Sequence, residues 1–548
     1  MPTIRIDSIL GGHSQASHIS GKDQFLSSLG IDPSMPFIDT RNTKFSNKPS
    51  GVLRPTSCNE LTVNGAGTVI NSVPYWIIPN PKDTNIYVYD GGGSVYTASG
   101  SIISLSDAGN MSSSNGNGAE YYDNYLYLAK NTDIARYGPL NGSPTFNGSY
   151  WQGTLSKAAL SNTAYPFTNG TGQMPNHVMH RHSDGKLYFG DVVGNQGAIH
   201  YISTTKTTVE GDTDNGSKIN ALKFGYGLWP TAIESYGQNL VIALAENSGL
   251  TSTITRNLRA KVAFWDTTST SFNTITWVEF PDPIITGMKN VDGILYVVSG
   301  GINNARGFRI SQYVGGTTFK EVMYFNDGYP PYAGALDGSS NRLLIGSQCE
   351  SPVRAACAYS FGLKGASLGK GMFNVLNAVL DTGAGGAIAT AVSLAVSQDL
   401  SYDNPMVGWA NGGTGFGNNG IVCDFSAGSV GGVGVYGATP SYFWSQIYKI
   451  GQPFQIKRIR IPLSQAVAAN MTITPTIYFD DGTQSQILTI INNTNFPNSE
   501  IVANIRTAGD GTNIIMGKNN FWIELKWSGT AFAAVELPII IDFDIIPD

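Results

Sequence analysis

Histidine is the scarcest charge-bearing residue type in this chain of 548 residues, with six copies, of which four lie between residues 177 and 200. Three of them, His177, His180 and His182, form a His-x-x-His-x-His pattern. On a strand, side chains two residues apart share a face, so His180 and His182 could bind a metal ion together. No Cys or Glu nearby completes a ligand set. The favoured interpretation is that these histidines lie on an inner strand and form hydrogen bonds across a channel.

Carboxylates are the next group that could do chemistry, because enzymes that hydrolyse glycosides use two of them facing a pocket. Glu120, Asp191, Glu234, Asp282 and Glu350 are available, but no spacing in the sequence marks two of them as a pair. We therefore predict that the protein is not an enzyme and needs no cofactor. The alternative is a carbohydrate-active enzyme, which two acids about 5 to 10 Å apart in an open central pocket would support.

Two further motifs match known sites only in part. Residues 210–216, EGDTDNG, resemble a calcium-binding loop but lack its distal bidentate glutamate, so a solvated turn is favoured. Residues 365–369, GASLG, match the Gly-x-Ser-x-Gly pattern of a nucleophile elbow. Such an elbow needs a later histidine, and the last one is His200. We attribute this match to chance in a glycine-rich chain.

Trp522 is the candidate for ligand binding near the C-terminus. In the run 521–527, alternation places Ile523, Leu525 and Trp527 toward a core and Trp522 outward with its polar neighbours. An exposed tryptophan can stack on a sugar ring or anchor a partner subunit. Both interpretations stay open, and the subunit contact is slightly favoured.

A short apolar strand after a polar turn recurs along the chain and must position these groups. Its copies are anchored at Ile86, Leu126, Leu187, Leu240, Leu295, Leu343 and Val407, spaced 40 to 64 residues apart. Each copy is preceded by a strand rich in small and apolar residues and followed by two more strands; the last of these, in the final copy, is 444–450. Four strands per repeat of about 40 to 50 residues are typical of a β-propeller. We predict an all-β fold with a seven-bladed propeller, with six blades as the alternative.

Composition and spacing also divide the chain into three parts. Residues 1–58 contain many prolines and predict an extended docking arm, 59–450 the propeller, and 451–548 a jelly-roll-like β-sandwich. The net charge of −6 disfavours sequence-wide nucleic-acid binding. No stretch is apolar enough to predict a membrane span or a signal peptide. Charged residues make up only 13%, which indicates a surface partly covered by other protein.

Several short phrases resemble uncharacterised bacteriophage tail proteins. They are ILGG at 9–12, GIDP at 30–33, SGVLRP at 50–55, GPLNG at 138–142, MPNH at 174–177 and IRIPL at 459–463. The resemblance spans the chain and implies a virion protein of the tail, assembled in the host cytoplasm. It implies a nozzle or tail-tip subunit whose partners are other tail proteins, copies of itself in a ring and a host-surface glycan. It assigns no functional residue.

Overall fold

The computed structural model describes residues 3–4, 76–97, 118–151, 177–203, 218–246, 259–346, 442–494 and 517–546 with side chains, short gaps apart, and elsewhere only the backbone of individual strands. The described secondary structure is β, apart from the short turns η3 (Phe272–Thr274) and η4 (Ala333–Ala335). The chain divides into two compact units, Met1–Asn59 with Ala358–Gly385 and Asp424–Asp548, and Glu60–Cys357 with Gly386–Cys423. In the described part, no helix has the length and apolarity to cross a membrane.

A sheet of four consecutive antiparallel strands is the repeating element of the second unit. In one such sheet, β22 (Ile284–Val291), β23 (Ile294–Gly300), β24 (Phe308–Gly315) and β25 (Thr318–Phe325) pair in chain order. The turn between β22 and β23 has positive φ at both of its central residues, 50° and 79°, as the predicted Asp-Gly hairpin requires. All residues of β23 after the first are buried, because this strand is covered on both faces.

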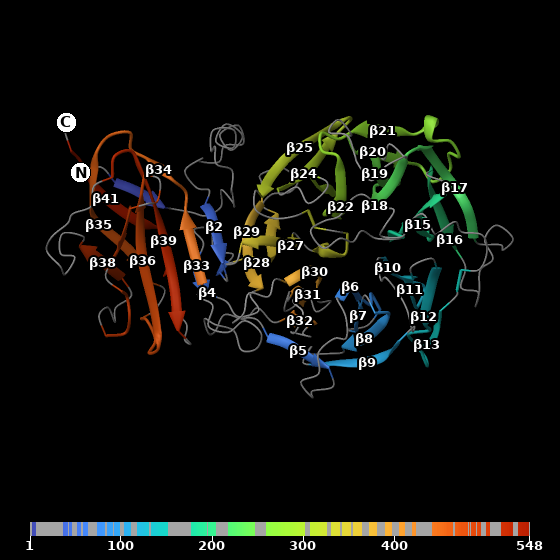
Figure 1. Ribbon diagram of the computed structural model, residues 1–548, viewed down its shortest axis with the longest axis horizontal. Helices are drawn as coiled ribbons and strands as arrows, with labels where there is room; N and C mark the ends of the chain where they lie inside the picture. Colours follow the sequence, from blue (N-terminus) through green and yellow to red (C-terminus); the bar gives the residue numbers. More distant parts are fainter. Residues whose placement is uncertain are drawn as a thin grey trace. The chain divides into compact units, whose positions relative to one another are not determined.

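Three further sheets repeat this order. Their strands are β10 (Ala119–Tyr122), β11 (Tyr125–Lys130), β12 (Asp133–Gly138) and β13 (Thr145–Asn147); β14 (Met179–Arg181), β15 (Leu187–Val193), β16 (Gln196–Ile202) and β17 (Ser217–Tyr226); and β18 (Leu228–Tyr236), β19 (Asn239–Glu246), β20 (Lys261–Trp265) and β21 (Thr276–Glu279). First strands lie toward the centre of this unit and fourth strands toward its rim (Figure 1). The predicted all-β propeller fold is confirmed.

The two ends of the repeated array meet at an N-terminal strand. One sheet has the order β30 (Ala389–Val396), β31 (Pro405–Asn411), β32 (Asn419–Cys423), β5 (Asn59–Val63), β9 (Ser104–Asn110), β8 (Ser94–Ala98), β7 (Ile86–Asp90) and β6 (Pro74–Pro79). Strand β5 pairs in parallel with β9 and neighbours β32 on its other side. The paired strands β26 (Leu336–Ser339) and β27 (Arg342–Ser351) follow β25 in the chain, and β28 (Arg354–Leu363) comes next. The number of blades stays a prediction.

Adjacent sheets of the second unit bury apolar residues against each other. One cluster joins Val241 and Ala243 of β19 to Ile285, Leu295 and Val297 of the next sheet. All five side chains are fully buried. At roughly 25 cal/mol per Å² of buried apolar surface, such contacts supply the main favourable term in holding the sheets together.

The first unit contains the predicted β-sandwich. One sheet has the order β1 (Thr3–Ile6), β41 (Ile539–Ile545), β35 (Phe454–Pro462) and β38 (Glu500–Asn504). The other has the order β2 (Phe37–Arg41), β33 (Ser441–Ser445), β39 (Asn520–Gly529), β36 (Met471–Phe479) and β37 (Gln484–Ile487), with β34 (Tyr448–Lys449) also pairing with β39. The remaining strands of this unit, β29 (Met372–Leu380), β3 (Thr43–Phe45), β4 (Val52–Pro55) and β40 (Val535–Glu536), pair in that order.

The sandwich includes strands from outside its predicted range of 451–548. Strands β1 and β2 of the predicted arm pair with β41 and β33. Residues 444–450, expected in the last blade, contribute to β33 and β34, which pair with β39. Alternating apolar residues predict a strand but not its partner.

Candidate functional site

The first strands of the blades each place one residue at the same register position. Each anchor lies in the second strand of its blade, and the residue directly after the anchor pairs with one residue of the first strand. For the anchors Ile86, Leu126, Leu187, Leu240, Leu295 and Leu343, these first-strand residues are, in the same order, Ile78, Glu120, His180, Glu234, Lys289 and Asp337. We call these six residues the channel layer. Five of the six are ionisable, although the first strands are otherwise largely apolar. The shared register brings charges together from segments more than two hundred residues apart.

Close contacts join neighbouring blades within the channel layer. Lys289 Nζ lies 2.9 Å from Asp337 Oδ1, and His180 Nε2 lies 3.4 Å from Glu234 Oε1. The Asp337 carboxylate is the main cause that raises the pKa of Lys289, so the Lys289 ammonium group keeps its proton at neutral pH. Burial, partly opposed by Glu234, lowers the pKa of His180. The His180 ring is therefore neutral at pH 7.

The three carboxylates of the channel layer each accept a hydrogen bond from the backbone of the next residue. The pairs are Glu120 Oε1 with Tyr121 N (3.0 Å), Glu234 Oε1 with Ser235 N (3.0 Å) and Asp337 Oδ1 with Gly338 N (2.8 Å). A first strand is the edge of its sheet, so alternate N–H groups have no neighbouring strand to pair with. The carboxylates supply the missing acceptors, which a buried N–H group requires.

Glu120 is the residue of the channel layer whose pKa is shifted toward neutral pH. Burial raises the pKa of Glu120 from 4.5 to about 7, Lys289 opposes this shift, and the like charges of Glu234 and Asp337 add to it. At neutral pH, the carboxyl group is thus divided between its protonated and ionised forms. A carboxyl group in this state can donate a hydrogen bond as well as accept one.

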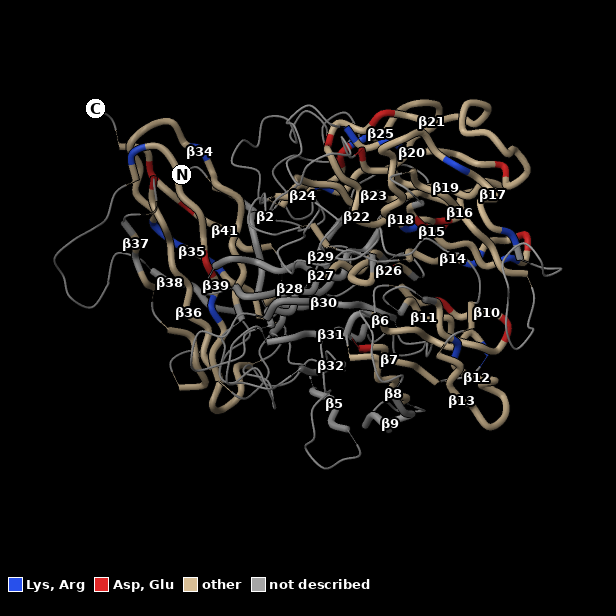
Figure 2. The backbone as a smooth tube through the Cα atoms, turned by 45° about the vertical axis from the view of Figure 1, so that its right-hand side comes forward, with Lys and Arg blue, Asp and Glu red and all other residues tan. Residues whose placement is uncertain are grey.

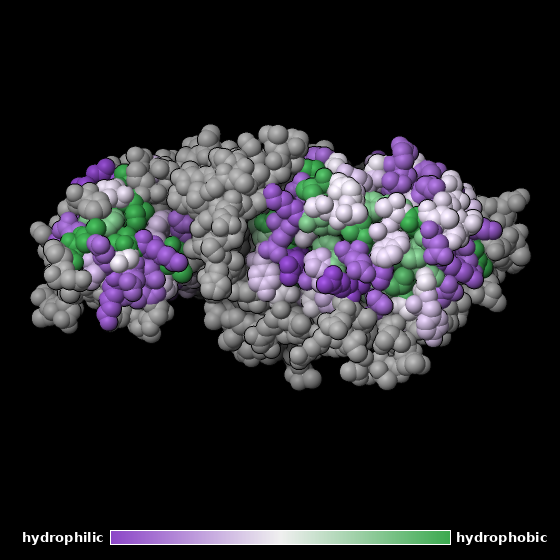
Figure 3. Space-filling view, turned by 90° about the horizontal axis from the view of Figure 1, so that it is seen from above, coloured by the Kyte–Doolittle hydropathy of each residue, from purple (hydrophilic) through white to green (hydrophobic). Residues whose placement is uncertain are grey.

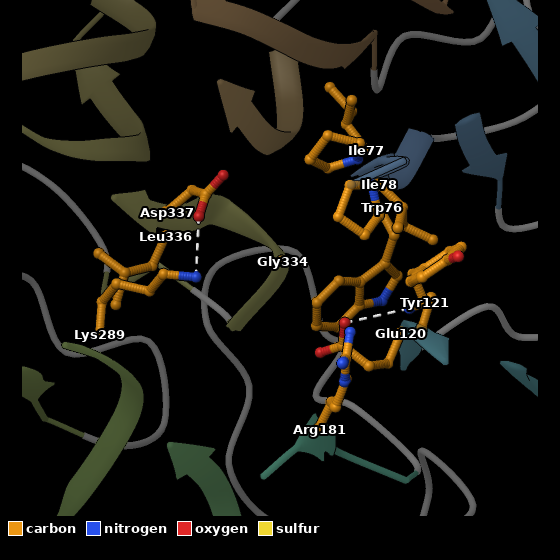
Figure 4. Close-up of a pocket in the computed structure, with 13 residues that line it drawn as sticks. Trp76, Ile77, Ile78, Glu120, Tyr121, Arg181, Lys289, Gly334, Leu336 and Asp337 are labelled. Carbon is orange, nitrogen blue, oxygen red and sulfur yellow. Dashed lines mark hydrogen bonds and ion pairs between the residues drawn. The ribbon is translucent and has the colours of Figure 1, made fainter. Parts of the chain in front are cut away.

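A cavity of about 280 Å³ opens beside Glu120 (Figure 4). Its walls come from five blades and include Trp76, Glu120, Arg181, Lys289 and Asp337. The indole nitrogen of Trp76 is buried and has no hydrogen-bond partner among the described residues. The cavity therefore offers an aromatic wall, an exposed guanidinium group and a set of donors and acceptors.

A second cavity of about 220 Å³ shares Tyr121 and Arg181 with the first. Its lining residues are Lys82, Tyr121, Tyr122, Asp123, Arg181 and Gly185. Lys82 Nζ contacts the neutral side-chain oxygen of Asn124 at 2.7 Å. Within the described ranges, neither Lys82 nor Arg181 makes an ion pair, although the exposed carboxylate of Asp123 lies on the same wall.

The predicted histidine group separates into two parts. His180 Nε2 and His182 Nδ1 both lie 2.8 Å from Ser235 Oγ on the next blade, whereas the sequence predicted hydrogen bonds across a channel. His177 is fully buried, with Nδ1 donating to the Gly190 carbonyl oxygen at 3.1 Å. Among the described side chains, no three His, Cys, Asp or Glu residues gather as a metal site.

The five candidate carboxylates are also divided. Glu120 and Glu234 lie in the channel layer, whereas Asp191 is buried inside its blade, 3.3 Å from His200 Nε2. Asp282 pairs with Arg309 Nε at 2.8 Å and accepts a hydrogen bond from Ser299. The side chain of Glu350, the loop 210–216 and the string 365–369 lie outside the described residues. Asp337 lines the same cavity as Glu120, but no motif around it in the sequence marks it as a site residue.

Trp522 has the predicted orientation. Ile523, Leu525 and Trp527 are fully buried in the sandwich core, whereas Trp522 is partly exposed. Its ring stacks on Tyr478 with centroids 5.4 Å apart and an interplanar angle of 8°. The contact joins β36 and β39, so it stabilises the outer face of the sheet. Sugar binding and subunit contact by Trp522 both stay predictions.

Glu524 differs from the expected exposed position beside Trp522. It is only 9% exposed, and its Oε2 atom accepts hydrogen bonds from Trp444 Nε1 at 2.8 Å and from the Tyr478 hydroxyl at 3.3 Å. Burial and the Glu524 charge raise the pKa of Tyr478 to about 12. The Glu524 carboxylate on β39 thus connects aromatic side chains of two neighbouring strands, β33 and β36, instead of facing solvent.

Elsewhere, charged residues are scattered along the described chain (Figure 2). One face shows hydrophobic residues interspersed with hydrophilic ones (Figure 3). The most exposed large apolar side chains are Tyr226 at 70%, Ile487 at 65% and Val314 at 52%, which come from three different sheets. Within the described part of the chain, the channel layer brings together charged groups from five separate first strands.

Comparisons with known proteins assign neither a family nor a function to this chain. No family model and no curated protein matches the chain. Among solved structures, the β-propeller domain of Cps50 (Swd1) from Myceliophteria thermophila is 10% identical, covers 67% of this chain and 99% of its own, and has a TM-score of 0.39. The N-terminal domain of Nup159 is 10% identical, with 65% and 90% covered and a TM-score of 0.36. An exo-β-1,3-galactanase from Phanerochaete chrysosporium is 10% identical, with 89% and 100% covered and a TM-score of 0.29.

Proposed function

We propose that this protein is a structural component of a bacteriophage virion, a tail nozzle or tail-tip subunit that acts by protein–protein scaffolding. The resemblance of its phrases at 9–12, 50–55 and 459–463 to phage tail proteins supports the virion assignment. A propeller combined with a sandwich supports the scaffolding role, because closed β-architectures keep their edges short and protected while their loops vary.

The state of the channel-layer carboxylates is the observation that favours scaffolding over catalysis. Each of the three accepts a hydrogen bond from its own strand. Asp337 is also paired with Lys289, and Glu234 contacts His180. Groups held in this way connect blades, and each has part of its hydrogen-bonding capacity occupied. A rigid disc with joined blades is suited to presenting fixed faces to several neighbours.

Purified particles provide the test. Mass spectrometry of virions should detect this chain in a constant ratio to other tail proteins, and antibody labelling should place it on the tail. Cross-linking should recover contacts with tail proteins and with other copies of this chain. Its absence from purified particles, with detection only in the lysate, would refute the assignment.

One observation favours the alternative of a carbohydrate-active enzyme. Glu120, with a pKa raised to about 7, faces the same cavity as Asp337, and glycosidases use an acid and a second carboxylate whose environments differ. If the protein is such an enzyme, Glu120→Gln should lower hydrolysis by roughly 100-fold or more, which is typical of losing a general acid. Glu279→Gln, an exposed carboxylate on β21, is the control. Under the scaffolding proposal, we expect that neither the wild type nor Glu120→Gln hydrolyses polysaccharides or aryl glycosides.

A further inference from the structure

The two cavities of the propeller lie side by side, because Tyr121 and Arg181 line both of them. Their volumes, about 280 and 220 Å³, are slightly below the usual range of pockets that bind small molecules. We call the cavity of about 220 Å³, which is lined by Lys82 and Arg181, the outer cavity. The cavity of about 280 Å³, which is lined by Glu120 and the Trp76 indole, is the inner cavity. A ligand that fills both must offer different chemistry at its two ends.

The outer cavity has the composition of a carboxylate site. Lys82 and Arg181 are both exposed, and within the described ranges neither has an ionic partner. A guanidinium group binds a carboxylate through two parallel hydrogen bonds, and an ammonium group adds a point charge. Asp123 reduces the local charge to about one positive unit, which suits a ligand with a single negative charge.

The inner cavity requires a polar but neutral ligand surface. Glu120 is divided between donor and acceptor forms at neutral pH, and Lys289 with Asp337 supplies further donors and acceptors. An apolar ligand would leave these groups desolvated and without hydrogen-bond partners, which disfavours its binding. Hydroxyl groups can satisfy them, while the indole of Trp76 provides a flat apolar wall for the C–H face of a sugar ring.

We propose that this double cavity binds an acidic saccharide, with the carboxylate between Lys82 and Arg181 and the hydroxyl groups beside Glu120. Phosphate alone would fill only the outer cavity, and a neutral sugar would leave both cations unpaired. The site lies in the propeller and is separate from Trp522 in the sandwich. The proposal holds whether or not the protein belongs to a virion, so its test can fail independently.

The test uses the full chain at pH 6 and low salt, with binding measured by calorimetry and by saturation-transfer NMR. The probes are glucuronic acid, glucose, inorganic phosphate and a triglutamate peptide. Glucuronic acid should bind, with glucose and phosphate each roughly 10-fold weaker or more. Arg181→Ala should weaken glucuronic acid by about 10-fold or more, since it removes a charged hydrogen-bond donor. Arg259→Ala, which removes another exposed arginine, should leave the affinity unchanged.

Four outcomes would overturn the proposal. They are no saturation by glucuronic acid up to about 50 mM, equal affinity for phosphate or glucose, tighter binding of triglutamate, and unchanged affinity in Arg181→Ala. Arg181 is exposed, so its variant should keep the unfolding temperature of the wild type. A matching thermal scan makes a loss of binding attributable to the site. Lys82→Ala gives a second measurement on the same cavity, with the same expected direction.

Discussion

At the residue scale, the charged groups of the channel layer are arranged so that each charge has a local partner. Lys289 is held by Asp337, Glu234 by His180 and by its own strand, and Glu120 by the Tyr121 N–H group. Glu120 is the exception in its electrostatics, because burial and two nearby carboxylates disfavour its ionised form. It therefore makes the propeller sensitive to pH near neutrality.

The Glu120 carboxyl group should make stability depend on pH. A glutamate whose pKa is raised in the folded state contributes stability that is present below the unfolded pKa and is lost as the pH rises through the folded pKa. The wild type should therefore lose free energy of unfolding relative to Glu120→Gln between about pH 4.5 and 7. A shift from 4.5 to about 7 limits this loss to about 3 kcal/mol. Denaturation at pH 4.5, 6 and 8 measures it.

Glutamine keeps the side-chain oxygen that accepts from Tyr121 N, so the variant should differ mainly in its titration. Glu279→Gln on the exposed face of β21 is the matched control and should change stability by less than about 0.5 kcal/mol at every pH. A pH-independent difference between wild type and Glu120→Gln would contradict the raised pKa.

At the scale of elements, β22 and β23 combine a two-residue turn, as also found between β10 and β11 and between β18 and β19, with a buried second strand. The turn between β22 and β23 has φ of 50° at Asp292 and 79° at Gly293. The following strand is buried after its first residue. Local turn chemistry and burial thus agree, which explains why this segment is readily recognised in the sequence.

Gly293 should be needed for its backbone conformation alone. A Cβ atom at this position would meet nothing within 4 Å, so any cost of Gly293→Ala comes from its positive φ. We expect a loss of about 1–2 kcal/mol in the free energy of unfolding. Gly142→Ala is the control, because its Cβ atom would make only an ordinary contact at 3.7 Å with Pro139. Equal effects of the two substitutions in thermal scans would contradict this explanation.

The alternation along β39 leads to a second prediction at this scale. Trp527→Ala should cost about 3–5 kcal/mol, because the ring is fully buried in the sandwich core. Trp522→Ala should cost about 1 kcal/mol, because the ring is partly exposed and loses mainly its stack on Tyr478. Hydrogen exchange of the sandwich strands, measured in each of the two variants, gives the loss in free energy of unfolding for comparison. A larger loss in Trp522→Ala would mean that the strand presents its other face to the core.

At the scale of the whole chain, each unit is completed by strands far apart in sequence. In the second unit, β5 lies between β32 and β9, so residues near 60 pair beside residues near 420. In the first unit, β1 pairs with β41, joining the two ends of the chain. Such closure removes exposed strand edges and makes folding depend on long-range contacts.

A proline in β5 should therefore open the second unit locally. Strand β5 has a neighbour on both sides; Leu61→Pro removes the one ladder hydrogen bond that this N–H group donates, and the proline ring disturbs the adjacent pairing. We expect faster amide hydrogen exchange in β9 and β32, and a loss of about 3 kcal/mol or more. Leu61→Ala keeps the N–H group and should leave exchange in both strands close to the wild type. Unchanged exchange in the proline variant would show that β5 does not close the array.

The sequence by itself determined the all-β fold, the recurring strand with its turn, and the outward direction of Trp522, because local periodicity and turn residues carry this information. Only the tertiary structure decided which strands pair, as with β33 and the sandwich, since alternation does not name a partner. It also decided the candidate site. Glu120, Arg181, Lys289 and Asp337 are far apart in the chain, and only the common register of the first strands brings them to one cavity.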